Sequence, residues 1–385
     1  MNVPMLYDKK WLFIILFWFM WFFNFSSRVV VGPVLPIIED NLAISHGASG
    51  GLVGLCFVGY GLSQLISGII ASRVGYRRTI LAGFLILIFA LIGAFFTRSY
   101  RFFALFFFLI GLAGGAYLPS IIYIITKKFP YESWGKAVGI HDSAAPSAIF
   151  ATPILVAFII TILNWRSVFL VIAFFCLIVS IIFFISIKEP ESHRKAGMPE
   201  ISIWLKKKST WILFLLWIIA AGLSTGTYNI FPLYLVKERG LSITFANKIF
   251  GITRIGGILL PVISGILADK IGFKKIIFFA IIIDGILTLF LGFSLPLSVM
   301  VILLFLQATI ISAFFPVGLI AVSSYAYKEI RSLAVGGSVA IAAFIGAGFT
   351  PFALGVIADY LSFATSLIIF GTISIIFSFF AFLLK

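Results

Sequence analysis

Hydrophobic side chains follow one another along this chain in runs of about 20 or more, separated by charged residues or by glycine and proline. A hydrocarbon core about 30 Å thick needs roughly 20 helical residues to cross it. The runs are continuously apolar rather than alternating, which predicts helices and not a β-barrel. The pattern predicts twelve transmembrane helices, at about 11–37, 48–72, 78–97, 102–126, 136–162, 165–188, 210–236, 244–268, 275–293, 296–327, 332–358 and 363–384.

The composition agrees with a membrane protein and excludes a water-soluble one. Of 385 residues, 62% are hydrophobic and 11% are charged, and the mean hydropathy is +1.19. Soluble globular proteins are roughly a quarter charged. The formal charge of +15 has almost no polar surface on which to form a nucleic-acid site. Cys56 and Cys176 both lie in apolar runs, so neither a disulfide framework nor a metal site is predicted.

The basic residues are distributed as a topology signal. With the N-terminus inside, 20 of the 28 Lys and Arg residues fall on the cytoplasmic side and six on the other side. The remaining two, Arg28 and Arg254, fall inside the membrane. The positive-inside rule therefore predicts that both termini are cytoplasmic, in a multi-pass protein of the cell (inner) membrane.

One polar stretch divides the chain into two halves. It predicts an N-terminal bundle of six helices at 1–188, a cytoplasmic linker at 189–209 and a C-terminal bundle of six helices at 210–385. The linker contains Lys206, Lys207 and Lys208. Besides a solvated linker, a regulatory or anionic-lipid contact through these lysines is an alternative.

The two halves are related by an internal duplication. A shift of 197 residues aligns 67–80 (SGIIASRVGYRRTI) with 264–277 (SGILADKIGFKKII), with six identities. The same shift pairs further residues over about 95 positions, among them Ser45 with Ser242 and Gly59 with Gly256. Because 197 residues span six helices, the halves have the same topology, which predicts a pseudo-two-fold axis along the membrane normal.

These repeated segments resemble the loop motif of the major facilitator superfamily, G-x-L-x-D-x-x-G-R-[KR], which lies between the second and third helices and again between the eighth and ninth. In this chain the matching residues are Gly68, Ile70, Ser72, Gly75, Arg77 and Arg78 in the first copy, and Gly265, Leu267, Asp269, Gly272, Lys274 and Lys275 in the second. Glycine permits a tight turn and close helix approach. Because Ser72 replaces the usual acid, we expect the cytoplasmic gate to depend on Asp269.

The resemblance implies an all-α membrane protein of two pseudo-symmetric six-helix bundles that rock around a central site. It implies a transporter of a small molecule, not an enzyme, that acts as a monomer without a cofactor. In this superfamily helices 1, 4, 7 and 10 line the cavity together with 2, 5, 8 and 11.

Two arginines in cavity-lining helices are the first candidates for substrate binding. A charge at mid-bilayer costs at least ~2.5 kcal/mol, so it normally faces a cavity or a partner. Arg28, with Asn24 one turn earlier, offers a guanidinium and an amide to a carboxylate or phosphate. Alternatively, Arg28 caps carbonyls near Pro33. Arg254 lies at a similar depth, and its alternative partner is Asp284.

Other polar residues complete the predicted site. His141 and Asp142 begin the fifth span and are candidates for proton coupling or gating, as is Asp284. The predicted ligand-orienting residues are Tyr60, Gln64, Tyr117, Tyr123, Tyr228, Asn229 and Gln307. The 45 phenylalanines are expected to face lipid or other helices, without a role in the site.

The predicted function is secondary active transport of a small organic anion, carboxylate or phosphate-like, by alternating access. Uptake of an anion against an inside-negative potential costs ~2.3 kcal/mol per charge per 100 mV, so import requires symport of protons or another cation. The alternative is a multidrug or amphiphile exporter of the same superfamily, suggested by the aromatic and apolar composition of the expected cavity.

Overall fold

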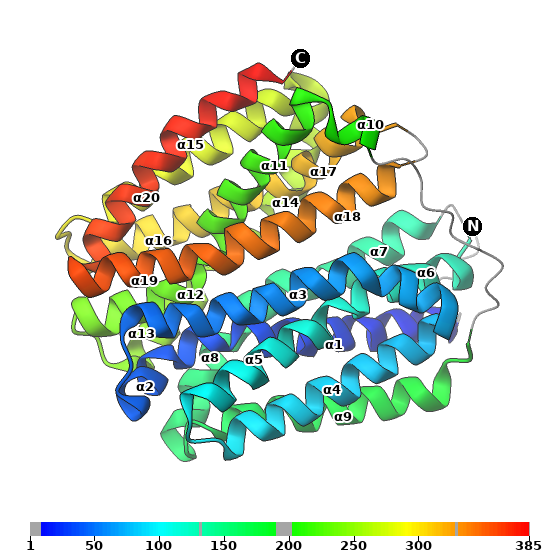
Figure 1. Ribbon diagram of the computed structural model, residues 1–385, viewed down its shortest axis with the longest axis horizontal. Helices are drawn as coiled ribbons and strands as arrows, with labels where there is room; N and C mark the ends of the chain where they lie inside the picture. The colour runs from blue at the N-terminus through cyan, green and yellow to red at the C-terminus, as the bar shows by residue number, and fades with distance from the viewer. Residues whose placement is uncertain (1–8, 131–132, 190–201, 328–329, 385) are drawn as a thin grey trace, which may run out of the picture.

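The computed structural model describes residues 9–130, 133–189, 202–327 and 330–384, and this part of the chain is helical throughout, without a strand (Figure 1). The first half of the chain forms α1 (Lys9–Val29), α2 (Val31–Leu42), α3 (His46–Val74), α4 (Tyr76–Phe96), α5 (Tyr100–Gly115), α6 (Tyr117–Lys128), α7 (Trp134–Asp142), α8 (Ala144–Ile162) and α9 (Ser167–Ser186). Successive helices such as α1 and α2 form one predicted span, so short breaks interrupt several spans.

The second half repeats this order and contains three π-helical segments, η2, η3 and η5, and two 3₁₀ segments, η4 and η6. Its elements are α10 (Ser202–Leu205), α11 (Lys208–Ala221), η2 (Gly222–Gly226), α12 (Thr227–Leu233), η3 (Tyr234–Glu238), α13 (Ile243–Ile252), η4 (Ile255–Ile258), α14 (Leu260–Ile271), α15 (Phe273–Leu291), α16 (Leu297–Ser312), α17 (Phe314–Tyr325), α18 (Arg331–Ile341), η5 (Ala342–Phe349), α19 (Thr350–Tyr360), α20 (Phe363–Ser378) and η6 (Phe379–Leu383).

Eleven helices in the described ranges are long and apolar enough to cross a membrane. They match the predicted spans except the ninth. The segment predicted as the ninth span is the helix α15, which is 19 residues long and contains Lys274, Lys275 and Asp284. The other spans have an apolar stretch with at most two charged residues, whereas α15 is too short for its stretch to avoid these three. The twelve-helix count and the cytoplasmic termini remain predictions. Most of the predicted linker, 190–201, lies outside the described residues.

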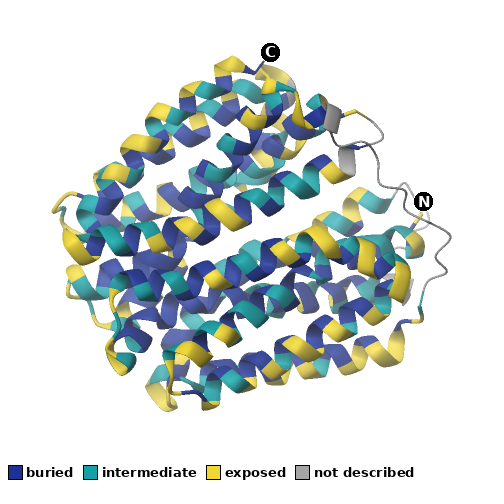
Figure 2. Ribbon diagram, viewed as in Figure 1, coloured by how far each residue is buried: buried dark blue, intermediate teal, exposed yellow. Residues whose placement is uncertain are grey.

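The lipid-facing surface is apolar, as expected for a membrane protein. Phe89 on α4 and Ile185 on α9 are 62% and 76% exposed, and many further large hydrophobic side chains are exposed on the outer faces of the helices (Figure 2). In water, exposed apolar area of this extent would drive association, whereas lipid tails cover it without penalty. The chain is therefore an integral, multi-pass membrane protein.

The duplication predicted from the sequence is visible in matched local structure. Ser45 and Ser242, 197 residues apart, both cap a helix: their hydroxyls accept hydrogen bonds from the amides of Ala48 and Phe245. A Cβ at Gly59 would clash with Phe108, and a Cβ at Gly256 would clash with Phe305 and Thr309. Phe108 and Phe305 are also 197 residues apart, so the same close helix crossing occurs in both halves.

The two halves contact each other along α3 with α19 and η5, α2 with α12, and α8 with α13. Glycines bring these helices together: a Cβ at Gly50 would clash with the carbonyl of Pro351, and one at Gly355 with the carbonyl of His46. These contacts lie toward the end that the sequence predicts to face outside.

Charged groups join the halves at the same end. Asp359 of α19 accepts hydrogen bonds from the amides of His46 and Gly47 at the start of α3, at 2.7 and 2.9 Å. Lys237 of η3 forms ion pairs with Glu39 and Asp40 of α2. We call these inter-half contacts the outer closure.

The opposite, predicted cytoplasmic end is more open. A Cβ at Gly68, Gly139, Gly265 or Gly336 would meet no atom within 4 Å. In the described residues the halves therefore meet at the predicted outer end, while these four positions at the predicted cytoplasmic end have no close neighbour. With the predicted orientation, we call this the cytoplasm-open arrangement.

Candidate substrate-binding site

Arg28 lies in the last turn of α1, which ends at Val29; α2 begins at Val31, so the first span is interrupted directly after Arg28. Its side chain is 2% exposed and is surrounded by aromatic rings. The guanidinium carbon lies 4.2 Å from the ring centre of Tyr60, 4.6 Å from Phe25 and 5.4 Å from Trp21. Rings that cover the faces of a guanidinium leave its N–H groups, at the edge of the plane, to bind an acceptor.

Few acceptors reach that edge in the described part of the chain. Nη2 of Arg28 donates to the side-chain oxygen of Asn24 at a long 3.4 Å, and Nε has no hydrogen-bond partner. Gly114 provides the space, because a Cβ there would lie 3.0 Å from Cδ and Nε of Arg28. The alternative in which Arg28 caps carbonyls near Pro33 finds no such hydrogen bond among these residues.

Arg254 also lies at a helix break, between the end of α13 at Ile252 and the start of η4 at Ile255. It is 4% exposed, and its guanidinium carbon lies 4.4 Å from the ring centre of Phe250 and 5.6 Å from that of Phe231. Nε and Nη2 both lack a partner among the described residues. These two nitrogens form the edge that binds a carboxylate through two parallel hydrogen bonds.

The alternative predicted from sequence, a direct ion pair between Arg254 and Asp284, does not form. Gln307 lies between them: its oxygen accepts from Nη1 of Arg254 at 3.1 Å, and its nitrogen donates to Asp284 at 3.1 Å. The same nitrogen donates to the carbonyl of Leu223 in the π-helix η2 at 2.7 Å. A glutamine offers both a donor and an acceptor, so it gives each charged group one hydrogen bond. Oδ1 of Asp284, like Nε and Nη2 of Arg254, has no partner among the described residues.

His141 belongs to a second cluster in the first half. It is fully buried, and its Nε2 lies 3.2 Å from the hydroxyl of Tyr117, which donates to the carbonyl of Phe17 at 2.9 Å. Its Nδ1 lies 3.2 Å from the carboxylate of Asp142. The ring of Trp21 stacks on both His141 and Tyr117, with ring centres 5.9 and 5.4 Å apart, and so connects this cluster to Arg28.

The remaining predicted ligand-orienting residues are distributed over several places. The side-chain oxygen of Gln64 is buried without a partner. Tyr228 stacks on Phe250 beside Arg254. Asn229 contacts Gly32 of α2, and its side-chain oxygen has no partner. Tyr123, in contrast, stacks on Tyr76 at 3.7 Å, so it belongs to the first copy of the loop motif rather than to the Arg28 cluster.

The loop motif forms the expected tight turns. Gly75 and Gly272 have φ values of +114° and +86°, which favour glycine. Glu189 accepts hydrogen bonds from the amides of Arg77 and Arg78 at 3.0 and 3.2 Å, and so supplies an acid where Ser72 has none. Gly68 and Gly265 have no close neighbour, so the close approach expected of them does not occur in this conformation.

The second copy of the motif is less fully described. Asp269 lies in α14, but its side chain lies outside the described residues. Lys274 and Lys275 lie in the first turn of α15. The gating role expected of these residues therefore remains a prediction.

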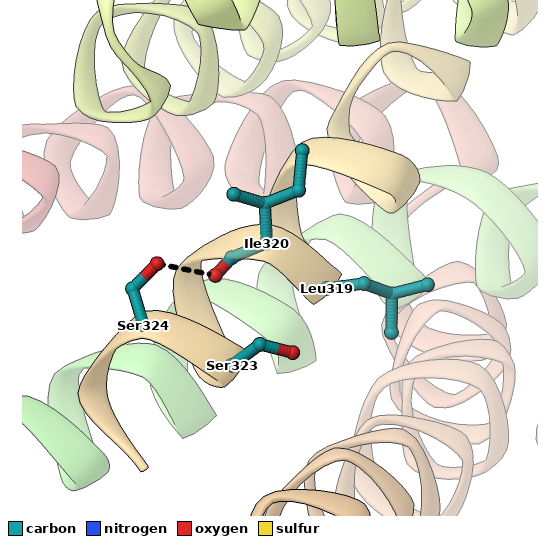
Figure 3. A pocket seen from close by; sticks show the side chains of 4 residues that line it. All are labelled: Leu319, Ile320, Ser323 and Ser324. Carbon is teal, nitrogen blue, oxygen red and sulfur yellow. Dashed lines mark hydrogen bonds between the residues drawn. The ribbon is translucent and has the colours of Figure 1, made fainter. Parts of the chain in front are cut away.

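A shallow hollow of about 340 Å³ lies on α17 (Figure 3). Leu319, Ile320, Ser323 and Ser324 line it, and the hydroxyl of Ser324 donates to the carbonyl of Ile320 within the helix. None of the predicted binding residues lines this hollow, so we assign it no role in the site.

Sequence reasoning missed the aromatic residues around the arginines, because it assigned the phenylalanines no site. Helical spacing would have found several of them: Trp21 and Phe25 lie seven and three residues before Arg28, and Phe250 lies four residues before Arg254. Asn247 was also missed; its amide donates to the carbonyl of Pro33 across the two halves at 3.1 Å.

The fold and the buried polar clusters at helix breaks are those of a membrane transporter. Residues 17–283 and 230–385 match the family model described as Major Facilitator Superfamily, and the chain belongs to this family of transporters of small molecules. A solved structure of a bacterial homolog of the human lysosomal transporter Spinster, described as inward-facing and unoccupied, superposes with a TM-score of 0.85 at 15% identity, covering 98% of this chain and 97% of that one.

Curated relatives match parts of this chain at 23–29% identity. An uncharacterized transporter, YybO, of Bacillus subtilis is 29% identical over 46% of this chain. The hexuronate transporter of the same organism is 24% identical over 70% of this chain. The multi-drug resistance efflux pump PmrA of Streptococcus pneumoniae is 23% identical over 66%. The chain spans 41%, 67% and 63% of the lengths of these three relatives.

Proposed function

We propose that this transporter carries a small organic anion, a carboxylate or a phosphate-like compound, across the cell membrane by alternating access. The observation that supports the proposal is a pair of buried arginines with unpaired N–H groups. Nε of Arg28, and Nε and Nη2 of Arg254, have no acceptor among the described residues. An uncompensated buried charge is costly, and a bound anion would remove that cost.

The positions of the arginines fit such a role. Each half of the chain supplies one arginine at a helix break, and transporter sites of this kind form where helices are discontinuous near the repeat interface. One chain provides both, so a monomer suffices. Among the relatives, the hexuronate transporter is named for an organic acid.

The test is transport into proteoliposomes of three labelled probes: glucuronate, galactarate and glycerol 3-phosphate. We expect wild-type protein to exchange at least one of them. Arg28→Ala and Arg254→Ala should each transport the labelled anion about tenfold or more slowly than the wild type, because a charge-assisted hydrogen bond contributes about 1.5–3 kcal/mol. Arg98→Ala, in a predicted outer loop, is the matched control and should transport like wild type. Unchanged transport in both Arg28→Ala and Arg254→Ala would overturn the proposal.

A second candidate is export of a lipophilic drug or amphiphile. The aromatic rings around both arginines favour it, and PmrA is a relative named for multidrug efflux. Overexpression should then confer resistance to lipophilic cations such as ethidium. Two buried arginines should repel such cations, so we expect no resistance.

A further inference from the structure

His141 is a buried residue that the anion site does not itself require. It is 0% exposed on α7, which packs against α1, α6 and α8. Both ring nitrogens lie at 3.2 Å from polar atoms: Nε2 from the hydroxyl of Tyr117, and Nδ1 from the carboxylate of Asp142. In a buried row of hydrogen-bonded groups, each contact needs one donor and one acceptor, so the positions of the protons are restricted.

Counting those protons gives His141 two distinct states. The hydroxyl of Tyr117 donates to the carbonyl of Phe17, which can only accept. Nε2 must then carry a proton in order to donate to Tyr117. The carboxylate of Asp142 also accepts, so Nδ1 must carry a proton as well. All contacts are therefore satisfied together when the ring is the doubly protonated imidazolium.

Loss of one proton requires a specific rearrangement. In the neutral ring the remaining proton stays on Nδ1, because the carboxylate of Asp142 can only accept. Nε2 is then an acceptor, and the hydroxyl of Tyr117 has to turn from the carbonyl of Phe17 to His141. Phe17 lies on α1, which also carries Trp21 and Arg28. The protonation state of His141 is thereby connected to the helix that holds the first arginine.

The cluster has a route to water on one side only. The side chain of Asp142 is 58% exposed, whereas that of His141 is fully buried. On the other side, the ring of Trp21 separates His141 from Arg28. The other charged side chains that the structure describes on the packed elements point elsewhere: Lys136 lies over Trp11, Lys128 over Phe13 and Lys127 over Tyr123. The helix α8 carries no titratable residue.

We propose that His141 binds the proton that crosses the membrane together with the anion, and releases it through Asp142 to the cytoplasm. This inference rests on the proposed anion transport and names its coupling ion. One proton cancels one anionic charge, and so removes the ~2.3 kcal/mol per 100 mV that the inside-negative potential imposes on anion import. The cytoplasm-open arrangement, with Asp142 exposed, is the state in which the proton would leave.

The test compares two measurements in the same proteoliposomes, with glucuronate as the probe, or whichever of the three compounds above the wild type exchanges. Exchange of internal for external anion needs no net proton movement, whereas accumulation driven by an imposed pH gradient does. We expect His141→Gln to retain exchange within about threefold of wild type and to lose gradient-driven accumulation. The same substitution at His193, in the predicted linker, is the matched control and should retain both activities.

Two further measurements do not depend on the folding of His141→Gln. Trapped pyranine should report one proton entering with each monoanion carried by wild-type protein. Asp142→Asn, at an exposed position, should need a higher proton concentration for half-maximal driven uptake, because it removes the carboxylate that stabilises the imidazolium.

The outcomes separate the two proposals. If wild-type protein exchanges none of the three anions, the proposed function fails and the inference fails with it. If His141→Gln accumulates anion as wild type does, or pyranine reports no proton entry, the inference is overturned while anion transport stands.

Discussion

At the scale of single residues, an aromatic environment makes each buried arginine directional. Rings of Tyr60 and Phe25 lie against Arg28, and rings of Phe250 and Phe231 lie against Arg254. Stacking fixes the guanidinium plane, so the free N–H groups point along one edge. A lysine has no plane and cannot present two parallel donors, which is why the site uses arginine.

Gln307 determines how the charges of the second half are balanced. Its amide contacts Arg254, Asp284 and the carbonyl of Leu223, all of them buried. Gln307→Leu leaves these groups without their partner, and a buried unsatisfied group costs about 1–3 kcal/mol. We expect the variant to unfold several degrees below wild type in a thermal unfolding assay in detergent.

Gln64→Leu is the matched control for that experiment, because the side-chain oxygen of Gln64 has no hydrogen-bond partner to lose. Its melting temperature should not fall below that of the wild type, because the substitution removes a buried acceptor that has no partner. Equal melting temperatures for Gln307→Leu and wild type would show that the bridge between Arg254 and Asp284 contributes nothing to stability.

The sequence was sufficient to find the arginines and Asn24 beside Arg28, but not the bridge between Arg254 and Asp284. Arg28 and Arg254 stand out because a charge in an apolar run has few explanations. The bridging of Asp284 by Gln307 depends on how α15 and α16 are rotated against each other. In membrane helices apolar residues cover the lipid-facing side as well as the packed side, so hydrophobic periodicity leaves that rotation undetermined.

At the scale of elements, the turn before α4 is held by an acid from elsewhere in the chain. Glu189, just after α9, accepts the amides of Arg77 and Arg78, which are free at the start of a helix. Glu189→Ala should therefore lower the stability of this helix start by about 0.5–2 kcal/mol. Hydrogen exchange would measure this loss of stability. The amides of Arg77 and Arg78 should exchange faster in Glu189→Ala than in the wild type.

Ser72→Ala provides the comparison, because Ser72 holds the position of the usual acid in the motif. Its hydroxyl donates to the carbonyl of Ile69 within its own helix, so the substitution should leave exchange at Arg77 and Arg78 unchanged. Faster exchange in Ser72→Ala than in Glu189→Ala would contradict the assignment of Glu189 as the cap.

Elements were easier to predict than their contacts. Apolar runs of about 20 residues and the turn glycines Gly75 and Gly272 are local signals: eleven of the twelve predicted spans and both turns are found in the described residues. Ser45 and Ser242 were paired by the repeat, but their capping role was not predicted. Glu189 was not recognised as a cap, because its partner helix begins more than 100 residues earlier in the chain. The breaks at Arg28 and Arg254 were also not predicted, because both lie inside runs that are long enough to cross the membrane uninterrupted.

At the scale of the whole molecule, the outer closure favours the cytoplasm-open arrangement. Asp359 joins the second half to the start of α3 in the first half, and Lys237 joins it to α2. A carboxylate at a helix N-terminus contributes about 0.5–2 kcal/mol. Because one or two kcal/mol changes a two-state ratio about 5–30-fold, loss of Asp359 alone should shift the balance between conformations.

We therefore expect Asp359→Ala to populate a state whose cytoplasmic end is closed. Cysteines introduced at Gly68 and Gly336, where a Cβ meets no atom within 4 Å, can carry spin labels in a variant that lacks Cys56 and Cys176. The distance between the two labels reports whether the cytoplasmic end is open or closed. The fraction of short label distances should rise.

Glu238→Ala is the control that isolates the connection between the halves. Glu238 also caps a helix start at the same end, at Phe363 and Ala364 of α20, but it does so within the second half. Its loss should weaken that half without changing the balance between conformations. Two results would contradict this: Asp359→Ala leaves the distance between the labels unchanged, or Glu238→Ala changes that distance as much as Asp359→Ala does. In either case the close glycine contacts between the halves, such as Gly50 against Pro351, hold the outer end closed on their own.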